Sequence, residues 1–313
     1  MIARFALFGA GSYPYVAWAE PGLMLNDAGL AFPTGEMAVS EPAWKAVNRA
    51  HWDEKVGLHL GPHGYDLTSL RAGHGRFNAI EEAELWPVDG KRILHLQCHF
   101  GADSLKLAQR GASVVGLDFS AAAIDAACRL ADELGLADRA QFVHADLYDA
   151  PTAIPEGAGF DMVFVTWGAL CWLPDIQGWA RIVSHFLKPG GSLYLADAHP
   201  AAMVFDDAAV SPDGRPGFFA PYFSAEPVVM DEPHDYVDET ATVQNATTHT
   251  WLHPLGDIVT GLLAAGMSLD WLHEHDAVTW RMFDILVQDA ELLWRWPDKP
   301  WLPLAFSLRA TRR

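Results

Sequence analysis

Apolar segments and segments with helical periodicity alternate along the chain from residue 91 onward. Residues 91–97, with Ile93, Leu94 and Leu96 at their centre, are typical of a buried strand, and residues 103–110 follow as a short helix that Gly111 ends. Further apolar runs of strand length occupy residues 112–118, 140–145, 160–166 and 192–197. Strands that alternate with helices run parallel and are joined by right-handed crossovers. The pattern therefore predicts an α/β fold with a doubly wound sheet.

The pattern changes on both sides of this alternating segment. Residues 200–252 are rich in proline and aspartate and predict an inserted cap. A helix at residues 255–265 and strands at 267–273 and 302–311 follow it. We therefore expect five parts: an irregular N-terminal extension, N-terminal lid helices, a core, the cap insertion and a C-terminal part of the core domain. They cover residues 1–36, 37–90, 91–199, 200–252 and 253–313.

Composition narrows the class of protein. Half of the residues are hydrophobic and 19% are charged, which excludes a disordered chain. The mean hydropathy is +0.06 and no run of eighteen apolar residues occurs, so no membrane span is expected. The three cysteines form no C-x-x-C pair, which favours a reducing, cytoplasmic location over a disulfide framework.

Charge points away from nucleic acids. The chain has 40 acidic and 21 basic residues and a formal net charge of −19. A phosphate backbone would be repelled, so nucleic acid is not an expected partner. A positively charged ligand would be attracted.

Acidic residues follow two neighbouring strands of the predicted sheet. Asp118 ends the second strand and Asp146 follows the third. Doubly wound sheets bind ligands at the carboxyl ends of their strands, where Asp118 would accept hydrogen bonds from ribose hydroxyls and Asp146 from an adenine amino group. Alternatively, both aspartates only cap the turns that follow.

The first strand–helix loop lacks most glycines of a dinucleotide site. That site requires G-x-G-x-x-G so that the backbone can approach a pyrophosphate, and here Gly101 remains while Gln97 and His99 stand at glycine positions. The loop therefore disfavours NAD and favours an adenosine cofactor without a pyrophosphate.

These features resemble the class I S-adenosylmethionine-dependent methyltransferases. The L-Q-C-H-F-G form of the first motif resembles a bacterial branch that methylates small molecules, and residues 48–53 resemble the N-terminal lid of that branch. The resemblance implies a Rossmann-like seven-stranded sheet of order 3-2-1-4-5-7-6 with strand seven antiparallel. Five segments in order carry it: residues 93–101, 115–120, 145–147, 160–164 and 187–191.

The resemblance implies S-adenosyl-L-methionine as the cofactor and methyl transfer to a small-molecule acceptor by in-line displacement. The expected cofactor-binding residues are Gln97, Cys98, Gly101, Asp118, Phe119, Asp146, Leu147 and Thr166.

Histidines supply the candidates for acid–base chemistry. His199, at the end of the fifth strand, is the predicted catalytic base, or else a structural histidine before Pro200. His253 is a second candidate on the acceptor side, or else caps the helix that follows it. His273 and His275 share a face of one strand, but no third ligand stands at a recognised spacing, so no metal site is expected.

The 13 tryptophans are unevenly distributed, and none lies between residues 87 and 166. Trp52, Trp167 and Trp172 are expected to face the acceptor, since rigid amphipathic rings suit planar or apolar groups. Residues 216–280 contain ten acids and no lysine or arginine. This favours a neutral aromatic or amine acceptor, unless the acids only form a solvated surface.

Two alternative functions remain at this level. One is a nicotinamide-dependent oxidoreductase built on the same kind of sheet. The other is a cofactor-binding protein without catalytic activity, which the altered first motif keeps open. Affinity for NAD(H) instead of S-adenosylmethionine would distinguish the oxidoreductase from a methyltransferase. A methylated product would distinguish a methyltransferase from the non-catalytic cofactor-binding protein.

Overall fold

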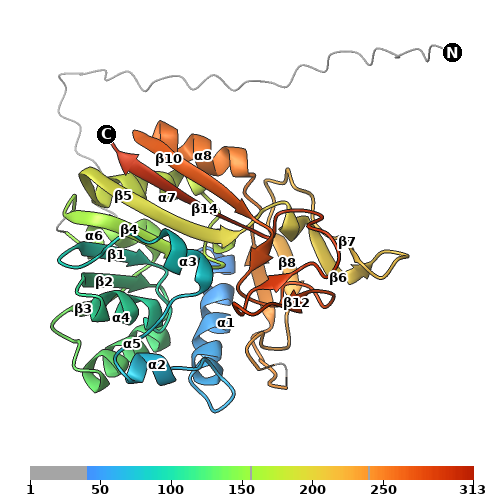
Figure 1. Cartoon of the computed structure of the whole chain (residues 1–313), viewed down its shortest axis with the longest axis horizontal. Helices are drawn as coiled ribbons and strands as arrows, with labels where there is room; N and C mark the ends of the chain where they lie inside the picture. Colours follow the sequence, from blue (N-terminus) through green and yellow to red (C-terminus); the bar gives the residue numbers. More distant parts are fainter. Residues whose placement is uncertain (1–40, 156, 239) are drawn as a thin grey trace, which may run out of the picture. The chain divides into compact units, whose positions relative to one another are not determined.

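A seven-stranded sheet forms the centre of the computed structural model, which describes residues 41–155, 157–238 and 240–313 (Figure 1). Its order is β3-β2-β1-β4-β5-β14-β10, and β14 is antiparallel to both of its neighbours while the other pairs are parallel. The predicted order and the antiparallel strand are confirmed. The strands are β1 (Arg92–Leu96), β2 (Ser113–Asp118), β3 (Ala140–His144), β4 (Phe160–Thr166), β5 (Leu187–Ala198), β10 (Met267–His275) and β14 (Ala305–Arg312).

Helices cover both faces of this sheet, and a separate hydrophobic core fills each side. On one side α4 (Ala102–Gln109) and α5 (Ala121–Glu133) pack against alternate strand residues such as Ile93 and Phe164. On the other side α6 (Ala150–Ala153), α7 (Ile176–Phe186) and α8 (Leu255–Ala264) pack against residues such as Leu94 and Val163. Burial on both faces explains why the strands are apolar without alternation.

Side-chain caps set the starts of α5 and α7. The Ser120 hydroxyl accepts a hydrogen bond from the backbone of Ala123 and caps α5, and a serine directly before a helical pattern predicts such a cap. Because proline is favoured in the first turn of a helix, the sequence predicts Pro174 in the first turn of α7, but the structure places it before that helix. The Asp175 side chain accepts from the Gly178 backbone, so the helix begins after Asp175.

The fifth strand is longer than expected. The predicted strand covers residues 192–197, but β5 begins at Leu187 because Leu187 pairs with Phe160 ahead of a register shift between β4 and β5. The extra residues of the shift lie in β5 between Leu187 and Ser192 and include Gly190 with φ of 78°.

The predicted lid contains α1 (Ala43–His59), α2 (Thr68–Arg71) and α3 (Ala79–Glu84). In Figure 1, α1 runs between the central sheet and the strands of the cap. It packs against α5 on one side and against cap strand β9 on the other. The expected helix start near residue 37 and the extension at residues 1–36 lie outside the described residues.

Small sheets form the cap and the segment before the last strand. The 3₁₀ turns η1 (Leu147–Asp149), η2 (Leu170–Trp172) and η3 (Ala202–Val204) follow β3, β4 and β5. The strand pairs are β6 (Phe205–Val210) with β7 (Pro216–Phe218), β8 (Val228–Asp231) with β9 (Thr247–Thr250), and β13 (Trp294–Arg295) with both β11 (Ala277–Val278) and β12 (Val287–Gln288).

In the parts of the chain described, no helix is both long enough and apolar enough to cross a membrane.

Candidate active site

The loop after β1 has the backbone of a glycine-rich loop without its glycines. Gln97, His99 and Gly101 have φ values of 57°, 50° and 77°, all in the left-handed region that glycine adopts at least cost. A Cβ at Gly101 would lie 2.6 Å from the ring of Phe142. The loop therefore retains the path of the family's first motif and uses two side chains where glycines are expected.

Asp118 joins this loop to the end of β2. Its carboxylate accepts hydrogen bonds from the backbone N–H groups of His99 (2.8 Å) and Ser120 (2.9 Å). Burial raises the pKa of Asp118 to about 6, and these hydrogen bonds oppose the rise. A carboxylate has about four lone-pair sites, so two remain for the hydroxyls of a ribose.

Asp146 is placed beside Asp118 by the next strand along. One carboxylate oxygen accepts from the backbone of Tyr148 at 2.8 Å and caps η1. The other lies 2.9 Å from Nζ of Lys45, which belongs to α1. The capping role that the sequence left open is therefore present at both aspartates, through Ser120 and Tyr148. Lys45 was not among the predicted site residues.

The lid helix contacts the ends of all three of these strands. Besides the ion pair of Lys45, the Ser120 hydroxyl donates to the carboxylate of Asp53, and Nδ1 of His59 lies 2.7 Å from Nε2 of His99. One helix thus covers the adenosine side of the site with polar side chains.

The remaining predicted cofactor residues lie in the loop after β1 or at the ends of β2, β3 and β4. Nε2 of Gln97 donates to the carbonyl of Ala169 at 2.9 Å, whereas its Oε1 is buried without a hydrogen-bond partner among the described residues. Burial raises the pKa of the Cys98 thiol well above its usual range, so Cys98 is a neutral packing residue. Leu147 and Thr166 are buried and Phe119 is half-buried.

These groups fit S-adenosylmethionine. Asp118 provides acceptors for ribose hydroxyls, and the unpaired Oε1 of Gln97 provides one for an ammonium group such as that of the methionine end. The left-handed loop lets backbone approach a ligand at the end of β1.

Comparison with known proteins agrees with this geometry. A family described as a methyltransferase domain matches residues 93–191. The core of the chain belongs to the class I S-adenosylmethionine-dependent methyltransferases. The predicted family, and S-adenosylmethionine as the cofactor of that family, are confirmed.

Two curated relatives of this methyltransferase core are named for different acceptors. A demethylmenaquinone methyltransferase of Clavibacter sepedonicus is 35% identical over 36% of this chain and 42% of its own length. A 23S rRNA uracil-C5-methyltransferase of Azoarcus sp. is 44% identical over 21% of this chain and 15% of its own length. The chain thus spans less than half of each of these curated relatives.

A solved structure supports the methyltransferase fold over a larger part of the chain. An S-adenosylmethionine-dependent methyltransferase from Mesorhizobium loti covers 74% of this chain and 96% of its own length. The TM-score is 0.51 and the sequence identity is 22%, which supports the fold alone.

Two of the three predicted acceptor tryptophans lie together. The rings of Trp52 and Trp172 have centroids 5.2 Å apart, and Trp52 also contacts the ring of His99 at 5.3 Å. Trp167 lies elsewhere: its Nε1 donates to Glu81 at 2.8 Å and its ring contacts Trp280. The lid and η2 therefore form one aromatic surface next to the cofactor loop.

The two predicted histidines near β5 are held by other groups. Nδ1 of His199 accepts from the backbone of Ala201 at 3.1 Å, and its Nε2 lies 3.0 Å from Glu274. Burial lowers the pKa of His199, and the charge of Glu274 opposes this. His253 contacts the carbonyl of Leu173 at 2.7 Å, so its side chain does not cap α8.

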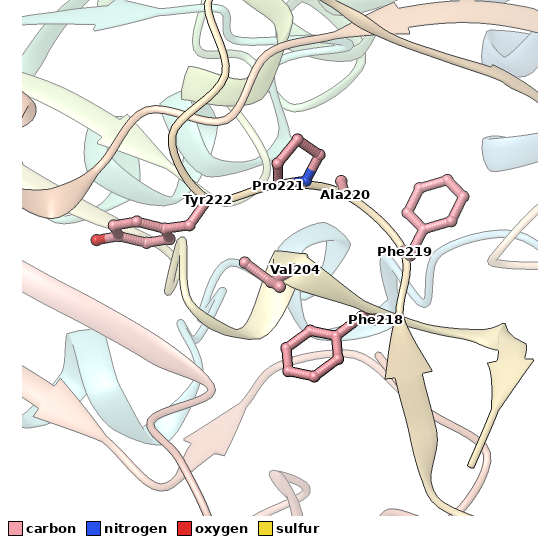
Figure 2. A pocket seen from close by; sticks show the side chains of 6 residues that line it. All are labelled: Val204, Phe218, Phe219, Ala220, Pro221 and Tyr222. Carbon is pink, nitrogen blue, oxygen red and sulfur yellow. The ribbon is translucent and has the colours of Figure 1, made fainter. Parts of the chain in front are cut away.

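Two pockets are lined mainly by apolar side chains. His253, Cys171 and Asp197 line a small pocket at the ends of β4 and β5. A wider one on the cap is formed by side chains that Figure 2 shows around a turn. These residues are Val204, Phe218, Phe219, Ala220, Pro221 and Tyr222.

The histidine pair on β10 has protein partners. Nδ1 of His273 lies 2.8 Å from Glu84, and Nε2 of His275 lies 2.8 Å from the hydroxyl of Ser307.

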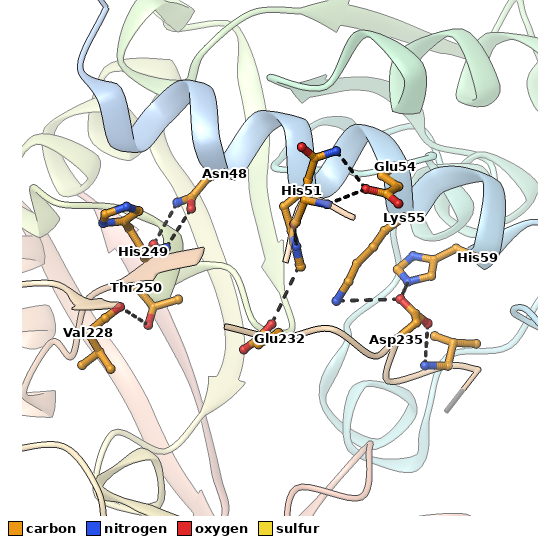
Figure 3. A network of polar contacts seen from close by, with 12 residues as sticks. Asn48, His51, Glu54, Lys55, His59, Val228, Glu232, Asp235, His249 and Thr250 are labelled. Atoms are coloured by element: carbon orange, nitrogen blue, oxygen red, sulfur yellow. Dashed lines mark hydrogen bonds and ion pairs between the residues drawn. The ribbon is translucent and has the colours of Figure 1, made fainter. Parts of the chain in front are cut away.

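The residues that sequence reasoning missed lie on the inner face of α1. Asn48, His51, Lys55 and His59 are buried, and they recur at the spacing of one helix face (Figure 3). Polar residues at that spacing beside Trp52 were the available signal. Their partners Glu232, Asp235 and His249 lie in the cap, about 180–200 residues away.

Proposed function

We propose that the chain transfers a methyl group from S-adenosylmethionine to a small-molecule acceptor by in-line displacement. The observation that carries this proposal is the left-handed loop from Gln97 to Gly101, which is bonded to the buried carboxylate of Asp118. This arrangement offers acceptors to a ribose and to an ammonium group. It offers no row of glycine N–H groups for a pyrophosphate, which disfavours the nicotinamide alternative.

The cofactor-binding set that we propose is the one expected from the sequence together with Lys45. Asp118 would hold the ribose, and Asp146 with Lys45 would lie at the adenine. Gln97 would accept from the ammonium group, and the side chains of Phe119, Leu147 and Thr166 would pack beside it.

S-adenosylmethionine supplies a methyl group on a sulfonium that is already activated as a leaving group. The chain's contribution is then chiefly to orient the acceptor and to exclude water. Trp52 and Trp172 would hold an aromatic or amine acceptor, with Trp167 and His253 further from the loop. His199 remains a candidate base at the end of β5, although both of its ring nitrogens have partners here.

A small molecule is the better acceptor class for this chain. The two pockets described above are lined mainly by apolar side chains, and residues 216–280 contain no lysine or arginine to pair with phosphates. The relative from Clavibacter is named for a small quinone precursor, whereas the one from Azoarcus is named for ribosomal RNA. Three unpaired cysteines suit a reducing cytoplasm, where we place the protein.

Calorimetric titration tests the cofactor assignment. We expect S-adenosylhomocysteine to bind and NADH not to bind. Asp118→Ala should weaken S-adenosylhomocysteine at least about tenfold, or about 1.4 kcal/mol, because the ribose acceptors are lost. Asp132→Asn, an exposed change on α5, serves as the matched control. Binding of NADH without binding of S-adenosylhomocysteine would refute the assignment. A library of phenols, alcohols and amines with labelled cofactor then tests transfer.

A further inference from the structure

Three side chains from distant segments form a continuous hydrogen-bonded chain at the cofactor loop. Nε2 of His59, at the end of α1, lies 3.0 Å from Oδ2 of Asp235 in the cap. Nδ1 of the same ring lies 2.7 Å from Nε2 of His99. Figure 3 shows His59 and Asp235 meeting between the lid helix and the cap. We call Asp235, His59 and His99 the relay.

The charge of Asp235 determines which ring nitrogens of the relay carry protons. Burial raises the pKa of Asp235, but the hydrogen bond from His59 and the backbone N–H of Val237 outweigh it and bring the pKa to about 2. Asp235 is therefore ionised and can only accept, so Nε2 of His59 carries a proton. With His59 neutral, its Nδ1 must accept from Nε2–H of His99. That leaves Nδ1 of His99 with a free lone pair.

We propose that His99 is the general base of the methyl transfer and that His59 and Asp235 hold the charge of the proton it removes. The proposal rests on the methyltransferase function above. The acceptor atom forms its bond to the methyl carbon while the carbon–sulfur bond breaks and its electron pair goes to sulfur. The acceptor's proton moves to Nδ1 of His99, and the Nε2 proton of His99 moves to Nδ1 of His59. The positive charge then lies on His59, beside Asp235.

The three residues of the relay together accept a proton more readily than His99 alone. Burial lowers the pKa of His99 to about 3, so His99 by itself is a weak base. Passing a proton to His59 moves the charge next to a carboxylate. The base and its charge site are thus separate residues.

The surroundings leave Asp235 as the counter-charge of the relay. Lys55 lies 3.7 Å from Asp235 and opposes a second positive charge, with Glu232 nearby as its further partner. The hydroxyls of Tyr65 and Tyr236 bond to each other at 2.8 Å, and burial raises the pKa of Tyr65 to about 12, so that pair stays neutral. The uncharged ring of Trp52 contacts the imidazole rings of His59 and His99, and the ring of Phe100 contacts that of His99.

The position of His99 favours a catalytic role over a purely structural role in holding the lid helix. Its backbone is left-handed, which costs a non-glycine residue about 1 kcal/mol, and such strain concentrates at functional sites. Its ring lies against Trp52, which in turn contacts Trp172 on the acceptor side. Nδ1 of His99 has no hydrogen-bond partner among the described residues, whereas Nδ1 of His199 accepts from the backbone of Ala201 and its Nε2 lies 3.0 Å from the Glu274 carboxylate.

The relay specifies a class of acceptor. A base is needed only when the methylated atom carries a proton at neutral pH. We therefore infer a phenol, an alcohol or a neutral N–H group as the acceptor, rather than a thiolate or a tertiary amine.

Nuclear magnetic resonance of ¹⁵N-histidine protein tests the relay without an acceptor. Long-range proton–nitrogen spectra of the full chain, free and saturated with S-adenosylhomocysteine, report the tautomer of each ring. We expect the Nε2–H tautomer at both His59 and His99 near neutral pH, with Nδ1 of each unprotonated. A proton on Nδ1 of His99 in its neutral form would overturn the proposal. This reading needs no variant, so it does not depend on a mutant folding.

Asp235→Asn tests the charge site, with Asp238→Asn in the same cap loop as the matched control. With the phenols, alcohols and amines of the acceptor library, we expect Asp235→Asn to lower the single-turnover rate at the plateau of its pH profile at least tenfold. The pH of half-maximal rate should fall, because removing the carboxylate weakens the base. Affinity for S-adenosylhomocysteine should change less than threefold. A residue that only clasps the lid would lower that affinity and leave the pH profile unchanged, and this outcome refutes the relay.

Failure of the two proposals can be told apart. If S-adenosylhomocysteine does not bind, the methyltransferase function fails and His99 loses its role as the base of methyl transfer, while the tautomers of the free protein still show whether the protons of the relay lie as described. If it binds and methyl transfer is pH-independent, the relay fails and the methyltransferase function stands.

Discussion

Glu81 is a buried carboxyl group on α3 whose ionisation opposes folding. It is 1% exposed, one of its oxygens accepts from Nε1 of Trp167 at 2.8 Å, and the other has no partner among the described residues. Burial and the charge of Asp103 raise the pKa of Glu81 from 4.5 to about 8, against the pull of the Trp167 hydrogen bond. The folded chain therefore holds a proton on Glu81 that the unfolded chain releases near pH 4.5.

Glu81→Gln should remove a pH-dependent loss of stability. Because the folded pKa is raised, wild-type stability is complete below pH 4.5 and falls as the pH rises toward 8. At about 1.4 kcal/mol per unit, the loss approaches about 4 kcal/mol at pH 8. Glutamine keeps an acceptor for Trp167 and has no charge. Urea unfolding at pH 5 and pH 8 should show nearly equal stabilities at pH 5 and a more stable variant at pH 8. Parallel pH dependences of the two proteins would contradict this.

At the level of elements, α1 is joined to the cap by hydrogen bonds between its side chains and the cap backbone. The side-chain amide of Asn48 donates to the carbonyl of His249 and accepts from its N–H, both at 2.8 Å. Glu54 accepts from the backbone N–H groups of Gln244 and Asn245 at 2.7 and 2.9 Å. These contacts fix the lid to the segment that contains β9, so that His59 and Asp235 meet.

Asn48→Ala should detach this part of the cap. Two partly buried backbone groups of His249 would lose their side-chain partner, and each such loss costs about 1–3 kcal/mol. We expect unfolding free energy to fall by about 2–4 kcal/mol in urea titrations, with faster amide hydrogen exchange in β9. Arg49→Ala is the matched control on the same helix, since its ion pair with Glu41 is half-exposed and worth less than about 1 kcal/mol. Equal effects of the two changes would show that the Asn48 contacts are dispensable.

The sheet was predictable from the sequence and the lid–cap contacts were not. Strand–helix alternation and the turn residues act over a few positions, so Asp118 and Asp146 could be placed at strand ends from the sequence alone. The bond between His59 and Asp235 joins residues 176 positions apart, and no local pattern specifies such a partner. The β11–β13–β12 sheet was missed for a related reason: two-residue strands carry too little periodicity.

The left-handed loop shows where sequence and backbone disagree. Gln97 and His99 replaced expected glycines and cast doubt on the first motif, yet the backbone keeps positive φ at both. Side-chain identity alone therefore understated how well the loop fits the family. The strain is visible only in the backbone dihedrals.

At the scale of the whole molecule, charge bears on the choice between small molecules and RNA. The formal net charge is −19, and the stretch from residue 216 to 280 around the acceptor side contains no lysine or arginine. RNA-binding proteins gain most of their affinity by neutralising phosphates with basic side chains, an effect that grows as salt is lowered. This chain would instead repel RNA more strongly at low salt.

We therefore expect no RNA binding where electrostatics are strongest. Filter binding of ribosomal and transfer RNA at about 50 mM salt should give no saturation up to tens of micromolar protein, and labelled S-adenosylmethionine should leave no label in either RNA. The rRNA methyltransferase of Azoarcus sp. is the positive control under the same conditions. Submicromolar binding that weakens steeply with salt would mean that a basic surface overrides the net charge, and the acceptor would then be RNA. Absence of binding at every salt concentration, with small phenols or amines methylated, would establish that the acidic surface excludes polyanions from the site.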